Sequence, residues 1–161
     1  MYLSETQLRL VEEVMKENSE AEIDVKGVSK LMIGLKHMTS DNAHVRGVVV
    51  SVASILSRSD MMLDSQSIGN ILYGMKSFNS GYLEVRDLIR VLTVKIEASD
   101  AVLNAQEIGN AVYGLQILNS DWIEVRDLLR VLTVKIEASD AVLNAQHIAN
   151  AVYGLQGLNS D

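Results

Sequence analysis

The stretch QEIGNAVYGLQIL, residues 106–118, has three counterparts in the chain. QSIGNILYGMKSF lies 40 residues earlier at 66–78, and QHIANAVYGLQGL lies 40 residues later at 146–158. A weaker copy, KGVSKLMIGLKHM, occupies 26–38. Repeats of this length are typical of helical hairpins that stack into a solenoid, where each unit buries its apolar face against its neighbours.

The copy at 106–118 has the apolar spacing of an amphipathic helix. Asn104 is the expected N-cap, and Glu107 three residues later completes a capping box. A glycine recurs at one position of this helix, which predicts that a neighbouring helix passes close to it. The apolar stripe is Ile108, Ala111, Val112, Leu115 and Leu118, and the recurring glycines are Gly34, Gly74, Gly114 and Gly154.

A second helix is predicted in each repeat, at about 123–138 in the third, after a turn at 119–121. Asp121 and Glu124 have the spacing of its capping box. GVVVSVASIL, residues 47–56, is rich in β-branched residues but aligns with this helix, so we predict helix there too. The expected apolar stripe is Val125, Leu128, Leu129, Leu132 and Ile136, widened by Val131 and Val134.

The predicted fold is therefore all-α: a right-handed α-solenoid of antiparallel two-helix repeats with a period of 40. Ser4 and Gln7 form a capping box at the start of an acidic half-repeat that we expect to act as an end cap. The chain stops inside a repeat, so we expect it to be part of a longer array, and the near-identity of copies indicates recent duplication or deliberate design. The units are 1–26 (half-repeat and cap), 27–66, 67–106, 107–146 and 147–161 (partial repeat).

The composition excludes several classes of protein. The chain has 161 residues, no proline, no cysteine and a formal net charge of −7. The acidic balance disfavours non-specific phosphate binding, and the absence of cysteine excludes disulfides and thiolate metal sites. The first residues lack the pattern of a secretory signal, and no apolar run is long enough for a membrane span. We expect a soluble protein, cytoplasmic by default, with its localisation otherwise open.

No catalytic constellation is present in the sequence. His37, His44 and His147 are scattered, without the spacing of metal ligands on one helix face. The recurring acids, such as Glu124 and Asp127, are typical of a solvated face rather than of an acid/base pair. We therefore predict no enzymatic activity, no metal and no cofactor.

The remaining candidates form a recognition surface on the first helices, away from their apolar stripes. Stacking would align them as ladders, with Gln, Asn and Tyr constant and one position variable from repeat to repeat. The Asn and Tyr side chains have an alternative structural role, in which Asn bonds neighbouring backbone and Tyr packs between repeats. The candidates are Gln66, Ser67, Asn70, Tyr73, Lys76, Gln106, Glu107, Asn110, Tyr113, Gln116, Gln146, His147, Asn150, Tyr153 and Gln156.

The pattern Gln-x-Ile-x-Asn-x-x-Tyr-Gly-Leu on the first helix of a unit of about forty residues resembles the octotricopeptide repeat. It is also similar to uncharacterised repeats in proteins of intracellular bacteria. Gln66, Asn70, Tyr73 and their copies match that family's framework, although Tyr replaces its usual Trp and its proline-rich stretch is missing. The resemblance implies stacked helical hairpins that bind single-stranded RNA, with nucleotides read by the exposed first-helix positions.

Two functions remain open. The acidic charge and the neutral polar ladders favour protein or peptide binding, as in a bacterial effector or a scaffold. The resemblance implies modular binding of single-stranded RNA, which would need a basic groove on the first-helix face; the second-helix arginines are expected on the outer face. The unfinished last repeat leaves Ile148, Val152 and Leu155 uncovered, so end-to-end self-association is also expected.

Overall fold

The computed structural model describes residues 3–17 and 23–158, whose regular structure is entirely α-helical. The all-α prediction is confirmed, and the β-branched stretch 47–56 lies inside α3 as the register predicted. Glu20 and Glu22 of the predicted acidic cap and the final turn 159–161 lie outside the described residues. The helices are α1 (Glu5–Glu17), α2 (Val25–Leu35), α3 (Ala43–Arg58), α4 (Ser65–Gly74), α5 (Leu83–Ala98), α6 (Ala105–Tyr113), α7 (Ile123–Glu137) and α8 (Ala145–Leu155).

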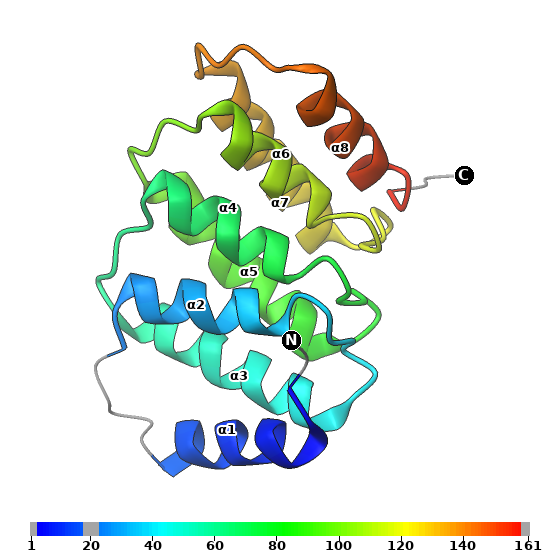
Figure 1. Cartoon of the computed structure of the whole chain (residues 1–161). Helices are drawn as coiled ribbons and strands as arrows, with labels where there is room; N and C mark the ends of the chain where they lie inside the picture. The colour runs from blue at the N-terminus through cyan, green and yellow to red at the C-terminus, as the bar shows by residue number, and fades with distance from the viewer. Residues whose placement is uncertain (1–2, 18–22, 159–161) are drawn as a thin grey trace.

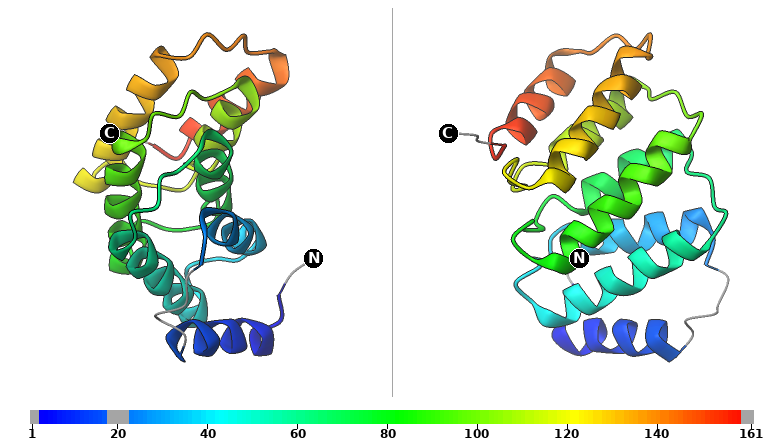
Figure 2. Two further views of the ribbon diagram at one scale, coloured as in Figure 1. Left: turned by 90° about the vertical axis from the view of Figure 1, so that its left-hand side faces the viewer. Right: turned by 180° about the vertical axis from the view of Figure 1, so that it is seen from behind.

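The helices form two rows (Figure 1). In one row α2 packs against α4, α4 against α6 and α6 against α8; in the other, α1 packs against α3, α3 against α5 and α5 against α7. The left view in Figure 2 shows the rows side by side, with the connecting loops between them. The helices inside each row therefore contact the equivalent helices before and after them, and the helices at the ends of a row contact one.

The core lies between the two rows. The predicted apolar stripe of the third repeat's first helix is buried, although α6 ends at Tyr113, before Leu115 and Leu118. Val125, Leu128 and Leu132 of α7 are buried as well. Leu63 and Leu103 in the connectors are also buried. Val134 contradicts the prediction that it widens the α7 stripe, because its side chain is 59% exposed.

The start of α6 is as predicted, but the start of α7 is not. Asn104 and Glu107 form the complete capping box. The predicted box of Asp121 and Glu124 is wrong: α7 begins after Trp122, with no side-chain cap bond. The Asp121 backbone N–H instead donates to Asn119 Oδ1 at 2.8 Å, and its carbonyl accepts from Arg126. This turn places Asp121 one residue too early to act as the N-cap.

The recurring first-helix glycines lie where consecutive helices of the row meet. A Cβ atom on Gly74, Gly114 or Gly154 would overlap the carbonyl oxygen of Met32, Leu72 or Val112, respectively. Gly34 has no described atom within 4 Å of its Cβ position, because α2 is the first helix of its row. The close approach is confirmed at the last three glycines and is absent at the first.

Candidate functional site

The predicted candidates come together on the outer side of α2, α4, α6 and α8, which we call the first-helix face. Tyr73, Tyr113 and Tyr153 form a stacked row along it. The Tyr73 and Tyr113 ring centroids are 5.7 Å apart, and those of Tyr113 and Tyr153 are 5.5 Å apart. Tyr73 and Tyr113 are half-buried, whereas Tyr153 is 50% exposed. The tyrosines therefore do pack between repeats, while one edge of the row remains open to a ligand.

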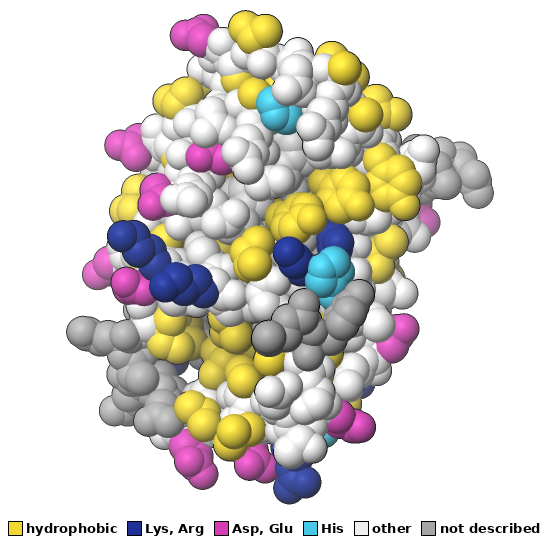
Figure 3. Space-filling model, in the orientation of Figure 1, with side chains coloured by type: hydrophobic (Ala, Val, Ile, Leu, Met, Phe, Trp, Pro, Cys, Tyr) yellow, Lys and Arg dark blue, Asp and Glu magenta, His cyan; other side chains and the backbone are white. Residues whose placement is uncertain are grey.

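Cationic side chains flank this row. Lys76 Nζ lies 5.3 Å from the ring centroid of Tyr73 and 5.7 Å from that of Tyr113, and Lys36 Nζ lies 5.8 Å from that of Tyr73. Burial and the charges of Lys76 and Lys36 lower the pKa of His37. Figure 3 shows Lys and His side chains beside a band of apolar and aromatic ones on this face. These contacts are cation–π interactions, which leave the ammonium groups available to an anion.

The asparagine row does not bond neighbouring backbone, contrary to the structural alternative. Asn70, Asn110 and Asn150 are half-buried, and their side-chain amides have no hydrogen-bond partner among the described residues. None of these amide atoms is a buried unsatisfied atom, so each reaches solvent. α4, α6 and α8 thus each offer an accessible amide donor and acceptor at an equivalent place, where α2 has Lys30.

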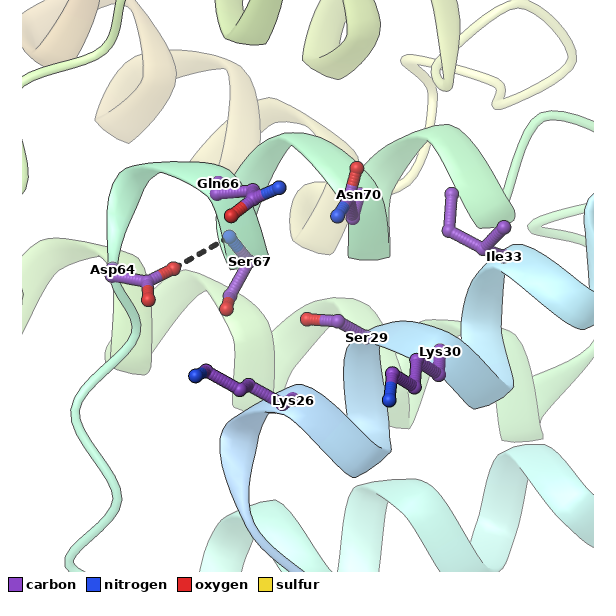
Figure 4. A pocket seen from close by; sticks show the side chains of 8 residues that line it. All are labelled: Lys26, Ser29, Lys30, Ile33, Asp64, Gln66, Ser67 and Asn70. Atoms are coloured by element: carbon purple, nitrogen blue, oxygen red, sulfur yellow. Dashed lines mark hydrogen bonds between the residues drawn. The ribbon is translucent and has the colours of Figure 1, made fainter.

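Two depressions lie between successive first helices. The one between α2 and α4, about 510 Å³, is shown in Figure 4 and is lined by Lys26, Ser29, Lys30, Ile33, Asp64, Gln66, Ser67 and Asn70. The one between α4 and α6, about 490 Å³, is lined by Asp64, Ser65, Gln66, Asn70, Asn104, Gln106, Glu107 and Asn110. Five of the candidate residues therefore line one depression: Gln66, Asn70, Gln106, Glu107 and Asn110. Sequence reasoning missed Ser29 and Asp64, although Ser29 differs from Gly69 and Gly109 at the same repeat position, and that difference was a usable signal.

The variable position serves local structure as well as the surface. Glu107 accepts hydrogen bonds from the Asn104 backbone N–H at 2.8 Å and from the Ser65 hydroxyl at 3.2 Å. His147 Nδ1 accepts from the Asn144 backbone N–H at 3.3 Å. Ser67, the smallest of the three, donates its backbone N–H to Asp64 and leaves room for a depression. Ser67 and Glu107 thus each line the depression at their own interface, with a hydroxyl group in one and a carboxylate in the other.

The glutamines and the remaining candidates are less constrained. Gln66, Gln106 and Gln146 are exposed at the first turn of their helices. Gln116 is half-buried and donates to the Tyr113 carbonyl at 3.1 Å, whereas Gln156 is exposed. The glutamines thus line the rim of the first-helix face.

The second-helix arginines are engaged within the protein. Arg86 and Arg126 donate hydrogen bonds to backbone carbonyls of the preceding turn. The shorter of these bonds are 2.8 Å, from Arg86 to Ser80, and 2.7 Å, from Arg126 to Ser120. Arg90 pairs with Asp87 and Glu124, and Arg130 lies 3.7 Å from Glu97. The cations of the first-helix face are instead lysines at its N-terminal end, and α6 and α8 contain no Lys or Arg. These lysines are Lys26, Lys30, Lys36 and Lys76.

Residues 3–17 and 23–158 contain neither a metal-binding cluster nor a membrane-spanning helix. No group of three or more His, Cys, Asp or Glu side chains is arranged to hold a metal ion. None of the described helices combines the length and apolar character needed to cross a membrane. In comparisons with known proteins, no family model, no curated protein and no solved structure matches this chain.

Proposed function

We propose that the protein is a non-enzymatic binding module that holds an extended peptide or protein segment along its first-helix face. The observation that carries the proposal is the row of asparagine amides on α4, α6 and α8, which make no hydrogen bond with any described residue. A side-chain amide can donate to a peptide carbonyl and accept from a peptide N–H. An extended chain presents such groups at regular intervals along its length.

The proposal includes a right-handed solenoid with a period of 40. It is supported by first helices that begin at Val25, Ser65, Ala105 and Ala145, and by the packing of each of them on the next. A solenoid gives a linear ligand equivalent contacts from successive repeats.

The distribution of charge favours a peptide over a nucleic acid. A single-stranded nucleic acid needs cations along its whole path, because each phosphate carries a charge. On the first-helix face, lysines lie only on α2 and α4 or directly after these helices. The negative charges of Asp64 and Glu107 interrupt the positive charge along this face. A peptide with acidic residues opposite α2 and α4 and neutral residues opposite α6 and α8 would match this distribution.

Single-stranded RNA, as in octotricopeptide repeats, is the second candidate. The tyrosine row with Lys36 and Lys76 favours it, since bases stack on aromatic rings and phosphates pair with lysine. For RNA, loss of the exposed ring by Tyr153→Ala and of charge by Lys76→Gln would both weaken binding, and affinity would fall steeply with salt.

Fluorescence anisotropy can separate the two. A labelled pool of degenerate peptides rich in Glu, Gly and Ser and a labelled random RNA pool are titrated with the protein. We expect the peptide pool to bind, and the double variant Asn70→Ala/Asn110→Ala to bind it about tenfold more weakly, which corresponds to about 1.4 kcal/mol. Arg130→Gln, which removes a charge from the other row, is the control and should bind normally. Tighter binding of RNA than of peptides would establish the second candidate, and failure of both pools to bind would overturn the proposal.

A further inference from the structure

The depression between α2 and α4 contains a buried hydroxyl group without a partner. Ser29 is 6% exposed, and its Oγ makes no hydrogen bond with any of residues 3–17 and 23–158. In Figure 4 this hydroxyl extends from α2 into the space between the two helices, on the side of Ser67. Buried hydroxyl groups in native proteins are nearly always paired, so an unpaired one that lines a depression indicates a missing hydrogen-bond acceptor.

The charges around this space suit a singly charged anion. Lys26 and Lys30 line the depression from α2, and Asp64 lines it from the start of α4, which leaves one net positive charge. Hydrogen bonds from the side chain and backbone of Ser67, together with the charge of Lys26, lower the pKa of Asp64. Asp64 is therefore ionised at neutral pH and cannot itself donate a proton to an incoming anion.

The next interface along the row shows which group occupies the equivalent space. Glu107 stands at the repeat position of Ser67, and its Cβ and Cγ lie 3.3 and 3.4 Å from the Cβ position of Gly69, which is the counterpart of Ser29. The carboxylate of Glu107 accepts two hydrogen bonds there. At the α2–α4 interface the shorter side chain of Ser67 stands at that position, and Asp64 supplies the single carboxylate among the residues that line the depression.

We propose that the depression between α2 and α4 binds a carboxylate group, which accepts hydrogen bonds from the Ser29 hydroxyl and from the ammonium groups of Lys26 and Lys30. The carboxylate belongs to the bound peptide, either as an Asp or Glu side chain or as the C-terminus, and in this respect the inference rests on the proposed function. Lysine and hydroxyl donors to an ionised acceptor make the stronger class of hydrogen bond.

The test uses NMR of the ¹⁵N-labelled full chain, titrated with small probes at millimolar concentration. N-acetyl-glutamate α-methylamide carries the side-chain carboxylate, and N-acetyl-diglycine carries a C-terminal one; their carboxamide analogues are the controls. We expect at least one carboxylate probe to shift amide signals of α2 and of the start of α4, and its carboxamide to leave them unchanged. Equal shifts from acid and amide, or no shift from either acid, would overturn the inference.

Variants locate the site. Lys30→Gln should weaken binding of the carboxylate probe about tenfold, the size expected for one charge-assisted hydrogen bond. Ser67→Glu should abolish it, because the new carboxylate would add a second negative charge, besides that of Asp64, to the lining that contains Lys26 and Lys30. Arg130→Gln should leave it unchanged. Normal probe binding by Ser67→Glu would show that the probe binds elsewhere and would refute the site.

The two proposals fail in different ways. If the peptide pool binds in an asparagine-dependent manner but no carboxylate probe shifts α2 or α4, only the carboxylate site is wrong. If the probes bind at α2 and α4 but no peptide pool binds, the carboxylate site stands without the extended peptide.

Discussion

A Cβ atom on Gly114 would overlap the carbonyl oxygen of Leu72, because α6 packs directly on the backbone of α4 at that point. The equivalent glycine of α2, Gly34, faces no described atom within 4 Å. One sequence position therefore has two opposite requirements, which depend on whether a first helix precedes it in the row.

Gly114→Ala should lower the free energy of unfolding by about 1–3 kcal/mol, since the backbone of α4 must move to admit the methyl group. Gly34→Ala is the matched control and should raise it by about 0.4–1 kcal/mol, because alanine restricts the unfolded chain and meets open space. Urea unfolding followed by circular dichroism measures both. Equal effects of the two substitutions would contradict the packing of α6 on α4.

Asn110→Ala should change the free energy of unfolding by less than about 0.5 kcal/mol, the usual range for surface substitutions away from special features. The physical reason is that the Asn110 amide has no hydrogen-bond partner among the residues that the structure describes. A thermal melt of the variant checks this. A loss of about 1–3 kcal/mol would show that the amide bonds buried backbone in solution and would remove it from the binding surface.

Tyr113 stacks on an aromatic ring on each side. Truncating a packed aromatic residue to alanine costs about 3–5 kcal/mol of stability. Tyr113→Ala should lower the free energy of unfolding by about that amount, or by somewhat less, because the Tyr113 ring is half-buried. Tyr113→Phe keeps the stack and should unfold like the wild type, since no described residue bonds the hydroxyl. Chemical denaturation of the pair gives the comparison. A large effect of Tyr113→Phe would mean that the hydroxyl group has a structural partner.

Low pH should weaken the packing contact between α1 and α3. Glu12 of α1 accepts a hydrogen bond from Lys16, and its carboxylate lies 2.7 Å from Nδ1 of His44 in α3. These two hydrogen bonds lower the pKa of Glu12 from the ordinary value of 4.5, and the bond from Lys16 has the larger effect. The unfolded chain therefore takes up a proton at this site before the folded chain does. The stabilisation is fully present above the ordinary value and is lost as pH falls through the lower folded value.

Unfolding free energies of wild type and Glu12→Gln, measured from neutral pH to about pH 3, test this. The difference between them should shrink as the solution becomes more acidic. A difference that stays constant, or grows, would show that Glu12 is not held ionised by Lys16 and His44.

The exposed apolar side of α8 predicts self-association. Ile148, Val152 and Leu155 are all about half exposed. Sedimentation velocity should show an apparent mass that rises with protein concentration, because burying this surface against another copy removes apolar area from water. Val152→Lys should suppress the rise, whereas Val134→Lys, an equally exposed position in the other row, should not.

Much of the fold could be predicted from the sequence. The spacing of apolar residues in 106–118 and its copies indicated the first helices, and alignment with 123–138 was enough to identify α3 as a helix despite its β-branched residues. The capping box at Asn104 was also readable, because an N-cap depends on neighbours three residues away. The start of α7 was not, since the bonds of Asn119 and Arg126 to Asp121 belong to a turn that competes with the cap.

The sequence by itself determined the repeat, the helices and the polar face that carries the candidate binding residues. These features follow from local periodicity and from the burial of apolar side chains away from water. Only the tertiary structure decided what each polar residue does. It shows that the Asn110 amide has no hydrogen-bond partner among the described residues, that Tyr73 and Tyr113 stack, and that Ser29 lines an open depression. These contacts depend on the distance between successive helices of a row. They also depend on the difference between Ser67 and Glu107, which affects the interfaces only when α2, α4 and α6 lie side by side.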